Sequence, residues 1–317
     1  MTSHDTVPAS PAPGLALADG GFAMLALDQR ESLRRMFPLV HGREVDDETL
    51  RRFKRDALDV LSPKASAVLL DRLYALDDRR PAELADDTAL ILAVDVLIQP
   101  PGLPVSGTEL DREVTPEFVE QVGADALKLL VIWRERDSAD ERAELVASFL
   151  ELAEQSGVVS LVEGIVRPSD GDYWTDHAER HEAILAAAAE LGGSGTTIYK
   201  AEVPGYVPGD VSLVREHAER LTAAVPVPWV VLSNGVAQDD FADALRESVA
   251  GGASGFLAGR AIWSDTVAEL DPSAALRTRS TARLDELGRI VSEARGADGT
   301  GNRPAGGTPD SGERGTP

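Results

Sequence analysis

The stretch TTIYKAEV, residues 196–203, is a short apolar run that predicts a buried β-strand and places Lys200 near its end. The chain has only four lysines beside 27 arginines, so its ordinary surface cation is arginine. A buried ammonium is costly unless it is paired or neutral, and a neutral lysine is a carbonyl nucleophile. Lys200 therefore has two possible roles: it is a Schiff-base nucleophile, or it forms a buried ion pair with Glu163 or Glu202.

Seven other apolar runs resemble this one. The eight predicted strands are residues 22–28, 67–71, 90–95, 126–133, 158–166, 196–203, 229–235 and 255–263. Patterns that predict helices lie at residues 47–61, 116–122, 138–155, 175–191, 210–223, 239–250 and 272–294, with a shorter helix expected at 81–86. Continuous apolar strands that alternate with helices indicate a parallel sheet covered on both faces. Eight such units over about 250 residues favour a closed (β/α)8 TIM barrel over an open doubly wound sheet.

The two ends of the chain lack this periodicity. Residues 1–14 are rich in Pro, Ala and Ser, and residues 296–317 are rich in Gly and Pro. Such segments cannot bury enough apolar surface to order themselves. We therefore expect a disordered N-terminal tail at 1–14, one barrel domain at 15–295, and a disordered C-terminal tail at 296–317.

The composition excludes several classes of function. A chain of 317 residues without cysteine forms no disulfide, thiolate metal site or catalytic thiolate. No apolar run reaches the ~18 residues of a membrane span, and the N-terminus lacks the pattern of a signal peptide, so a cytoplasmic location is expected. A net charge of −23 argues against nucleic-acid and membrane partners. Further copies of this chain in a homo-oligomer are expected partners, and any anionic substrate must be captured by a local site that works against the negative charge of the whole protein.

Polar residues gather where the predicted strands end. These ends carry Asp28 and Gln29, Asp71, Asp95, Lys128, Glu163, Lys200 with Glu202, Ser233 with Asn234 and Gly235, and Gly259 with Arg260. A single such residue would be explained as a helix cap. In a (β/α)8 barrel, however, the C-terminal strand ends form the active site. The whole ring, with two lysines in it, therefore favours an active site.

Three of these residues suit carbonyl chemistry. Lys128 and Lys200 come from alternate strands, which place side chains in the same layers of the barrel. Two ammonium groups in that space raise each other's cost of ionisation, so we expect one lysine with a lowered pKa to act as the nucleophile, without deciding which. Glu163, on the strand between them, is positioned to transfer protons as a general acid and base.

The last two strands predict an anion site. Ser233 and Gly235 follow the seventh strand, and Gly259 and Arg260 follow the eighth, where such barrels commonly bind phosphate. Glycines let backbone N–H groups approach an oxyanion, and arginine makes bidentate contacts. No metal site is expected: His177 and its neighbour one helical turn on belong to a charged helix face without a third ligand.

The motifs at these positions resemble those of a known family. GGFAMLALDQRESLRRMF, DALKLLVIWR, EGIVRP, IYKAEVP, LSNGV and GGASGFLAGRAIW are similar to segments of the class I sulfofructosephosphate aldolases. They are also similar, less closely, to those of the tagatose-bisphosphate aldolases of the same superfamily. The resemblance covers roughly residues 18–295.

The resemblance implies a cofactor-free and metal-free class I aldolase on a (β/α)8 barrel. Its Schiff-base lysine falls on Lys200, its acid/base glutamate on Glu163 and its second lysine on Lys128. The DQR motif implies that Asp28, Gln29 and Arg30 lie near the substrate. One departure is that Gly164 follows the glutamate where the family has proline.

The reaction implied is cleavage of 6-deoxy-6-sulfofructose 1-phosphate to dihydroxyacetone phosphate and 3-sulfolactaldehyde. A tagatose- or fructose-bisphosphate aldolase is the alternative enzyme, and a non-catalytic barrel that binds sugar phosphates is the alternative of another class. For the second anionic end of the substrate we expect Gln29 and Arg30, with Ser62 or Lys64 as further candidates. This supply of cations is thin for a second dianion, which favours the monoanionic sulfonate.

Overall fold

The structure, a computed structural model, describes residues 12–100 and 102–300, with side chains up to residue 296. Eight parallel strands close into a barrel in the order β1-β10-β9-β8-β7-β6-β3-β2. The strands are β1 (Phe22–Ala26), β2 (Ala67–Asp71), β3 (Ala89–Ala93), β6 (Ala126–Trp133), β7 (Val159–Val166), β8 (Ile198–Ala201), β9 (Trp229–Val231) and β10 (Gly255–Ala258). The predicted (β/α)8 TIM barrel is confirmed.

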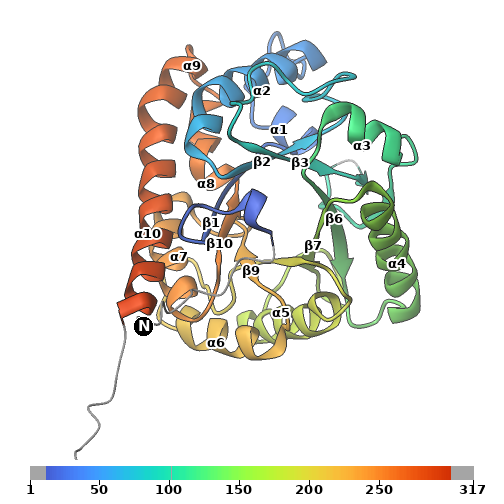
Figure 1. The fold of residues 1–317 in the computed structure, drawn as a ribbon, viewed down its shortest axis with the longest axis vertical. Helices are drawn as coiled ribbons and strands as arrows, with labels where there is room; N and C mark the ends of the chain where they lie inside the picture. The colour runs from blue at the N-terminus through green and yellow to red at the C-terminus, as the bar shows by residue number, and fades with distance from the viewer. Residues whose placement is uncertain (1–11, 101, 301–317) are drawn as a thin grey trace, which may run out of the picture.

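Helices surround this ring of strands, as Figure 1 shows in a view along the barrel. They are α1 (Glu31–Arg34), α2 (Asp47–Leu61), α3 (Pro116–Val122), α4 (Ala139–Ser156), α5 (His177–Gly192), α6 (Val214–Ala224), α7 (Phe241–Ala250), α8 (Arg260–Trp263), α9 (Pro272–Ala275) and α10 (Thr281–Thr300). Side chains cap several of them, because the first N–H groups of a helix need acceptors. Asp46 accepts from Thr49 N at α2, and Ser138 accepts from Glu141 N at α4.

Three local predictions were wrong. Residues 81–86 form turns and no helix. The eighth strand ends at Ala258, and residues 260–263, predicted as strand, form the short helix α8. A hairpin of β4 (Asp95–Ile98) and β5 (Gly107–Leu110) follows β3 and was not predicted as two strands. Its exposed positions alternate with half-buried ones, so it lacks the continuous apolar run on which the strand predictions relied.

The N-terminal end of the barrel is filled by apolar side chains. A short 3₁₀ turn, Pro13–Leu15, places Leu15 and Ala12 in a cluster with Phe22 and Met24 of β1 and residues of the other strands. Ordered structure therefore begins before the expected boundary at residue 15. At the other end α10 continues past residue 295 to Thr300. Most of both predicted tails, 1–11 and 301–317, lies outside the described residues.

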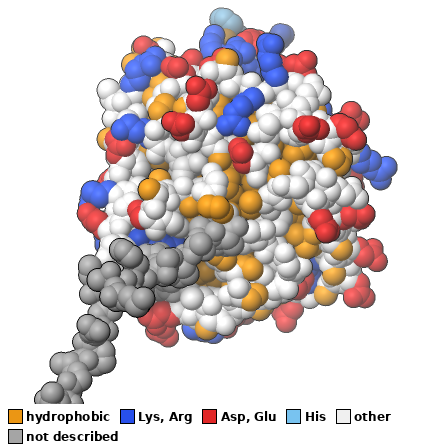
Figure 2. Space-filling model, in the orientation of Figure 1, with side chains coloured by type: hydrophobic (Ala, Val, Ile, Leu, Met, Phe, Trp, Pro, Cys, Tyr) orange, Lys and Arg blue, Asp and Glu red, His pale blue; other side chains and the backbone are white. Residues whose placement is uncertain are grey.

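The surface mixes charges of both signs. On the face drawn in Figure 2, acidic and basic side chains are interspersed around the rim, and hydrophobic side chains are exposed mainly nearer the centre. Within the described ranges, no helix has the length and apolar character that crossing a bilayer requires.

Candidate active site

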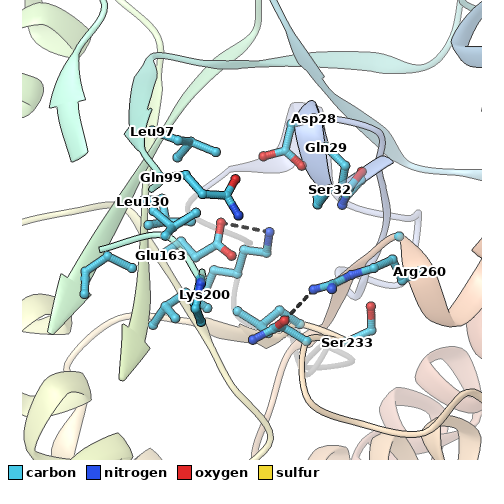
Figure 3. Close-up of a pocket in the computed structure, with 18 of the residues that line it drawn as sticks. Asp28, Gln29, Ser32, Leu97, Gln99, Leu130, Glu163, Lys200, Ser233 and Arg260 are labelled. Carbon is cyan, nitrogen blue, oxygen red and sulfur yellow. Dashed lines mark hydrogen bonds and ion pairs between the residues drawn. The ribbon is translucent and has the colours of Figure 1, made fainter. Parts of the chain in front are cut away.

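A cavity of about 420 Å³ opens at the C-terminal ends of the barrel strands. Eight of the ten residues predicted for the site line it, namely Lys128, Glu163, Lys200, Asp28, Gln29, Ser233, Gly259 and Arg260. The other two, Arg30 and Gly235, do not. Figure 3 shows Glu163 and Lys200 near the middle, with Ser233 and Arg260 on one side and Leu97, Gln99 and Leu130 on the other.

Glu163 lies between the two lysines. The parallel register of β7 and β8 sets Glu163 directly beside Lys200. Glu163 Oε2 is 3.1 Å from Lys200 Nζ and 2.7 Å from Lys128 Nζ. All three side chains are buried. A single carboxylate oxygen therefore contacts both amines, a geometry in which a proton can pass between the carboxylate and a group bound at either lysine.

Lys128 is surrounded by carboxylates. Its Nζ also lies 3.1 Å from Asp28 Oδ2 and 3.0 Å from Asp95 Oδ2. Burial by itself disfavours the ammonium, but Asp28, Asp95 and Glu163 outweigh it and raise the pKa of Lys128 above its ordinary value. Mutual repulsion between two lysines, the cause expected from the sequence, does not govern this residue. Lys128 is a fixed cation, and a protonated amine has no lone pair to attack a carbonyl.

The carboxylates of the cavity are held in their ionised form. Burial alone would raise the pKa of Glu163, but the charges of Lys128 and Lys200 lower it below 4.5. The same balance, with burial opposed by Lys128 and Lys200, lowers the pKa of Asp28. Glu163 therefore begins a reaction as a base, in contact with an amine that can form an imine.

Arg30 supports the cluster from behind. Its Nη1 donates to Asp95 O at 2.7 Å and its Nη2 to Asp95 Oδ1 at 3.1 Å. Asp95 in turn accepts from Lys128 and from the backbone N–H of Leu130. Arg30 therefore contacts Asp95 and does not line the cavity, and its predicted place near the substrate stays a prediction. The sequence marked Asp95 as a strand end, but the pairing depends on a fold that brings the ends of β1 and β3 to the same rim of the barrel.

The predicted anion site is assembled except for Gly235. The Nη2 group of Arg260 donates to Asn234 Oδ1, and Arg260 has no carboxylate partner among the described residues. Burial lowers its pKa. A Cβ at Gly259 would lie 2.4 Å from Ala26 O, so only glycine allows β10 to approach β1 this closely. Gly235 is exposed and has a φ of 78°, which suits a turn beside the cavity.

Two further predictions for the second anionic end are wrong. Ser62 and Lys64 precede β2, so they lie at the opposite end of the barrel from the cavity. Ser62 is buried and accepts from Ala85 N, and Lys64 pairs with Asp285 at 3.1 Å. The sequence reasoning missed Arg167, which lines the cavity and stands in the motif EGIVRP. The sequence feature that could have identified Arg167 is its place directly after the predicted strand at residues 158–166, where the active site was expected.

The glycine after Glu163 has a packing cause. A Cβ at Gly164 would lie 2.2 Å from Tyr199 Oη and 3.2 Å from Leu191 Cδ1. Tyr199 is buried and directly precedes Lys200 on β8. A larger residue at position 164, proline included, would therefore displace the tyrosine beside Lys200.

In the part of the chain that the structure describes, no group of three or more His, Cys, Asp or Glu side chains could hold a metal ion. His181, one turn after His177, is buried and its Nε2 lies 3.2 Å from Tyr206 O. Both histidines lie on α5, away from the residues that line the cavity.

Comparison with known proteins places the chain among aldolases. It is 27% identical over 312 residues to a tagatose 1,6-diphosphate aldolase 2 of Streptococcus pyogenes serotype M3, covering 86% of this chain and 91% of that protein. A tagatose 1,6-diphosphate aldolase of Listeria monocytogenes is 25% identical over 304 residues, covering 86% and 88%.

Solved structures share the fold. An archaeal fructose 1,6-bisphosphate aldolase superposes with a TM-score of 0.60 at 18% identity, covering 88% of this chain and 96% of that one. A fructose-bisphosphate aldolase of Plasmodium falciparum gives 0.66 at 15% identity, covering 90% and 93%. The model of the DeoC/LacD family aldolases matches residues 22–265. The chain belongs to the DeoC/LacD family of aldolases.

Proposed function

We propose that the protein is a class I aldolase that cleaves 6-deoxy-6-sulfofructose 1-phosphate to dihydroxyacetone phosphate and 3-sulfolactaldehyde. The observation that carries the proposal is the contact of Glu163 with both Lys200 and Lys128 at the centre of the cavity. Lys128 is held as a cation by three carboxylates and has no lone pair to attack a carbonyl, which leaves Lys200 as the nucleophile. A barrel that only bound sugar phosphates would need neither a nucleophile nor a proton shuttle.

The reaction follows from these positions. Lys200 Nζ attacks the C2 carbonyl, and the carbinolamine loses water to give a protonated imine. Glu163 then removes the proton of the C4 hydroxyl, the C3–C4 bond breaks, and its electron pair moves into the imine to form an enamine. The aldehyde leaves. Protonation of the enamine at C3 and addition of water release dihydroxyacetone phosphate and restore the amine.

Lys128 and Asp28 prepare this chemistry. Lys128 keeps Glu163 ionised and presents a cation to the hydroxyl oxygens of the substrate. Asp28 holds Lys128 from the side of β1. Gln29, whose Oε1 is buried without a hydrogen-bond partner among the described residues, is an acceptor for a substrate hydroxyl.

The cavity wall favours a sulfonate over a second phosphate. Leu97 and Leu130 line the part of the cavity away from Arg260 (Figure 3), and Ile132 and Ile165 also belong to the lining. A sulfonate carries one negative charge, which a single arginine can balance, and a phosphate carries close to two, so burial beside apolar side chains costs the phosphate more. Tagatose- and fructose-bisphosphate cleavage remain the alternative, which the tagatose 1,6-diphosphate aldolases among the relatives favour.

The reaction class is tested by trapping the imine. Incubation with dihydroxyacetone phosphate and borohydride should add a stable mass, which peptide mapping should locate at Lys200, and EDTA should leave activity unchanged. An adduct at Lys128 would overturn the assignment, as would activity that EDTA abolishes and zinc restores. Lys64→Met, a lysine at the other end of the barrel, is the control that keeps both adduct and activity.

The substrate is tested by direct competition. We expect kcat/KM for the sulfonated ketose phosphate to exceed that for tagatose or fructose bisphosphate at least ~10-fold, which corresponds to about 1.4 kcal/mol in transition-state binding. Equal or better cleavage of either bisphosphate would reject the sulfonated substrate and leave the Schiff-base reaction standing.

A further inference from the structure

Arginines in this acidic protein generally have carboxylate partners, but two enclosed ones in the cavity do not. Arg167 and Arg260 both line the cavity, are largely enclosed, and form no ion pair with a carboxylate among the described residues. Arg35, the third arginine of the lining, is exposed at the rim. Arg260 belongs to the anion site already described. Arg167 has no role in the chemistry assigned to the other residues.

The two arginines stand on either side of the proposed nucleophile. In the barrel order β10-β9-β8-β7, Arg260 follows β10, Lys200 lies on β8 and Arg167 follows β7. A ligand whose carbonyl carbon is bound at Lys200 therefore has one cation on each side. This arrangement suits a molecule with an anionic group at each end and a carbonyl between them.

The side chain of Arg167 has spare hydrogen-bonding capacity. Its Nη1 donates to Val166 O at 3.0 Å, and its Nε is buried without a partner among the described residues. A buried donor without an acceptor is costly, so a ligand that supplies one gains affinity. The planar guanidinium of an arginine can also donate two parallel hydrogen bonds to two oxygens of one phosphate or sulfonate group.

Charges of both signs surround Arg167. Burial lowers the pKa of this guanidinium, Arg134 and Arg180 lower it further, and Glu202 and Asp172 oppose the shift. Glu202, the nearby carboxylate, is already engaged: it accepts from Arg180 Nη2 at 3.0 Å and from Val166 N at 2.8 Å. Because Glu202 is bound elsewhere and Arg167 forms no ion pair within the described residues, the guanidinium of Arg167 is left to attract an anionic ligand in a protein whose net charge is −23.

We propose that Arg167 binds the terminal anionic group of the substrate that is remote from the end held by Arg260, whether that group is a sulfonate or a phosphate. Arg167 is thus the residue that selects ketoses charged at both ends over ketose 1-phosphates. The kinetic test of this assignment rests on the aldolase activity proposed above. The binding test does not need that activity.

Kinetics with matched substrates test the selection. Arg167→Gln should lower kcat/KM about 10- to 100-fold for the sulfonated ketose phosphate or a ketose bisphosphate, the loss of a charge-assisted hydrogen bond. It should change kcat/KM for fructose 1-phosphate or tagatose 1-phosphate less than ~3-fold, and Arg167→Lys should restore part of the loss. The matched control is Arg136→Gln. Arg136 follows β6 and pairs with Asp170 of the loop after β7, and removing its charge should change kcat/KM for neither kind of ketose. Equal losses for both kinds of ketose, or none, would overturn the proposal. The relative losses for sulfonate and phosphate tell which group the site prefers.

Binding without turnover tests the site independently. Isothermal titration with methanesulfonate and with inorganic phosphate should detect two sites in the wild-type protein and one each in Arg167→Gln and Arg260→Gln. Two sites retained in Arg167→Gln would place the second anion elsewhere and overturn the proposal. Because this readout needs no reaction, absence of aldolase activity would reject the proposed function without deciding the role of Arg167.

Discussion

Lys54 and Lys128 are equally buried, at 1% exposure each, yet their surroundings give them opposite properties. Lys54, on α2, has one carboxylate partner, Asp71, and burial outweighs that partner, so the pKa of Lys54 is lowered. Lys128 has three carboxylate partners, which outweigh burial and raise its pKa. Lys54 also lies outside the cavity lining, whereas Lys128 faces it. The number of carboxylate partners sets the direction in which the pKa of a buried lysine shifts, and access to the cavity decides whether the amine can serve a reaction.

The strongest test of this contrast removes one carboxylate charge from each region. Glu163→Gln should retain imine formation but lose about 100- to 10,000-fold in turnover, the usual contribution of an acid/base group. Asp71→Asn should keep turnover within a few-fold, because Asp71 does not line the cavity. Borohydride trapping and steady-state kinetics, with folding checked by circular dichroism, measure both variants. Near wild-type turnover in Glu163→Gln would assign the proton transfer to another residue.

The second test concerns stability. Lys54→Met leaves the fully buried carboxylate of Asp71 without its cation, so the free energy of unfolding should fall by about 3 to 5 kcal/mol. The double variant Lys54→Met/Asp71→Asn should recover most of this loss, because the amide oxygen can still accept from Tyr74 N. Denaturant unfolding checks both, and a double variant no more stable than Lys54→Met would mean that packing, and not the unpaired charge, dominates.

The smallest expected effect is a shift of the pH profile. Glu163 must be ionised to accept a proton, and Lys128 and Lys200 hold its pKa below the ordinary value of a glutamate, so activity is lost as pH falls through that lowered pKa. Lys128→Met removes the largest lowering influence while burial and the charge of Asp28 remain. The acid limb of kcat/KM should then move to higher pH. Lys64→Met should leave the limb in place, and an unmoved limb in Lys128→Met would show that Lys200 alone keeps Glu163 ionised.

The sequence predicted the barrel because eight apolar runs stand in regular alternation with helices, and it predicted most of the cavity because strand ends meet at one face. It failed where the cause is a contact between distant segments. Lys54 lies in RRFKRD, which has the look of a solvated helix face, and its burial against Asp71 depends on how α2 packs on β2. Arg30 follows the family motif yet turns to Asp95, 65 positions away. No local pattern encodes such pairings.

The apolar filling of the lower barrel, with Leu15 and Ala12 beneath Phe22 and Met24, has a consequence for the order of events during turnover. Substrate, water and both products all cross the same rim at the C-terminal strand ends. In the proposed cycle the aldehyde must depart through this opening before water can reach the imine that remains on Lys200. In this proposed cycle the two products leave in sequence through one opening, with the aldehyde first and dihydroxyacetone phosphate, which stays bound to Lys200 until water is added, last.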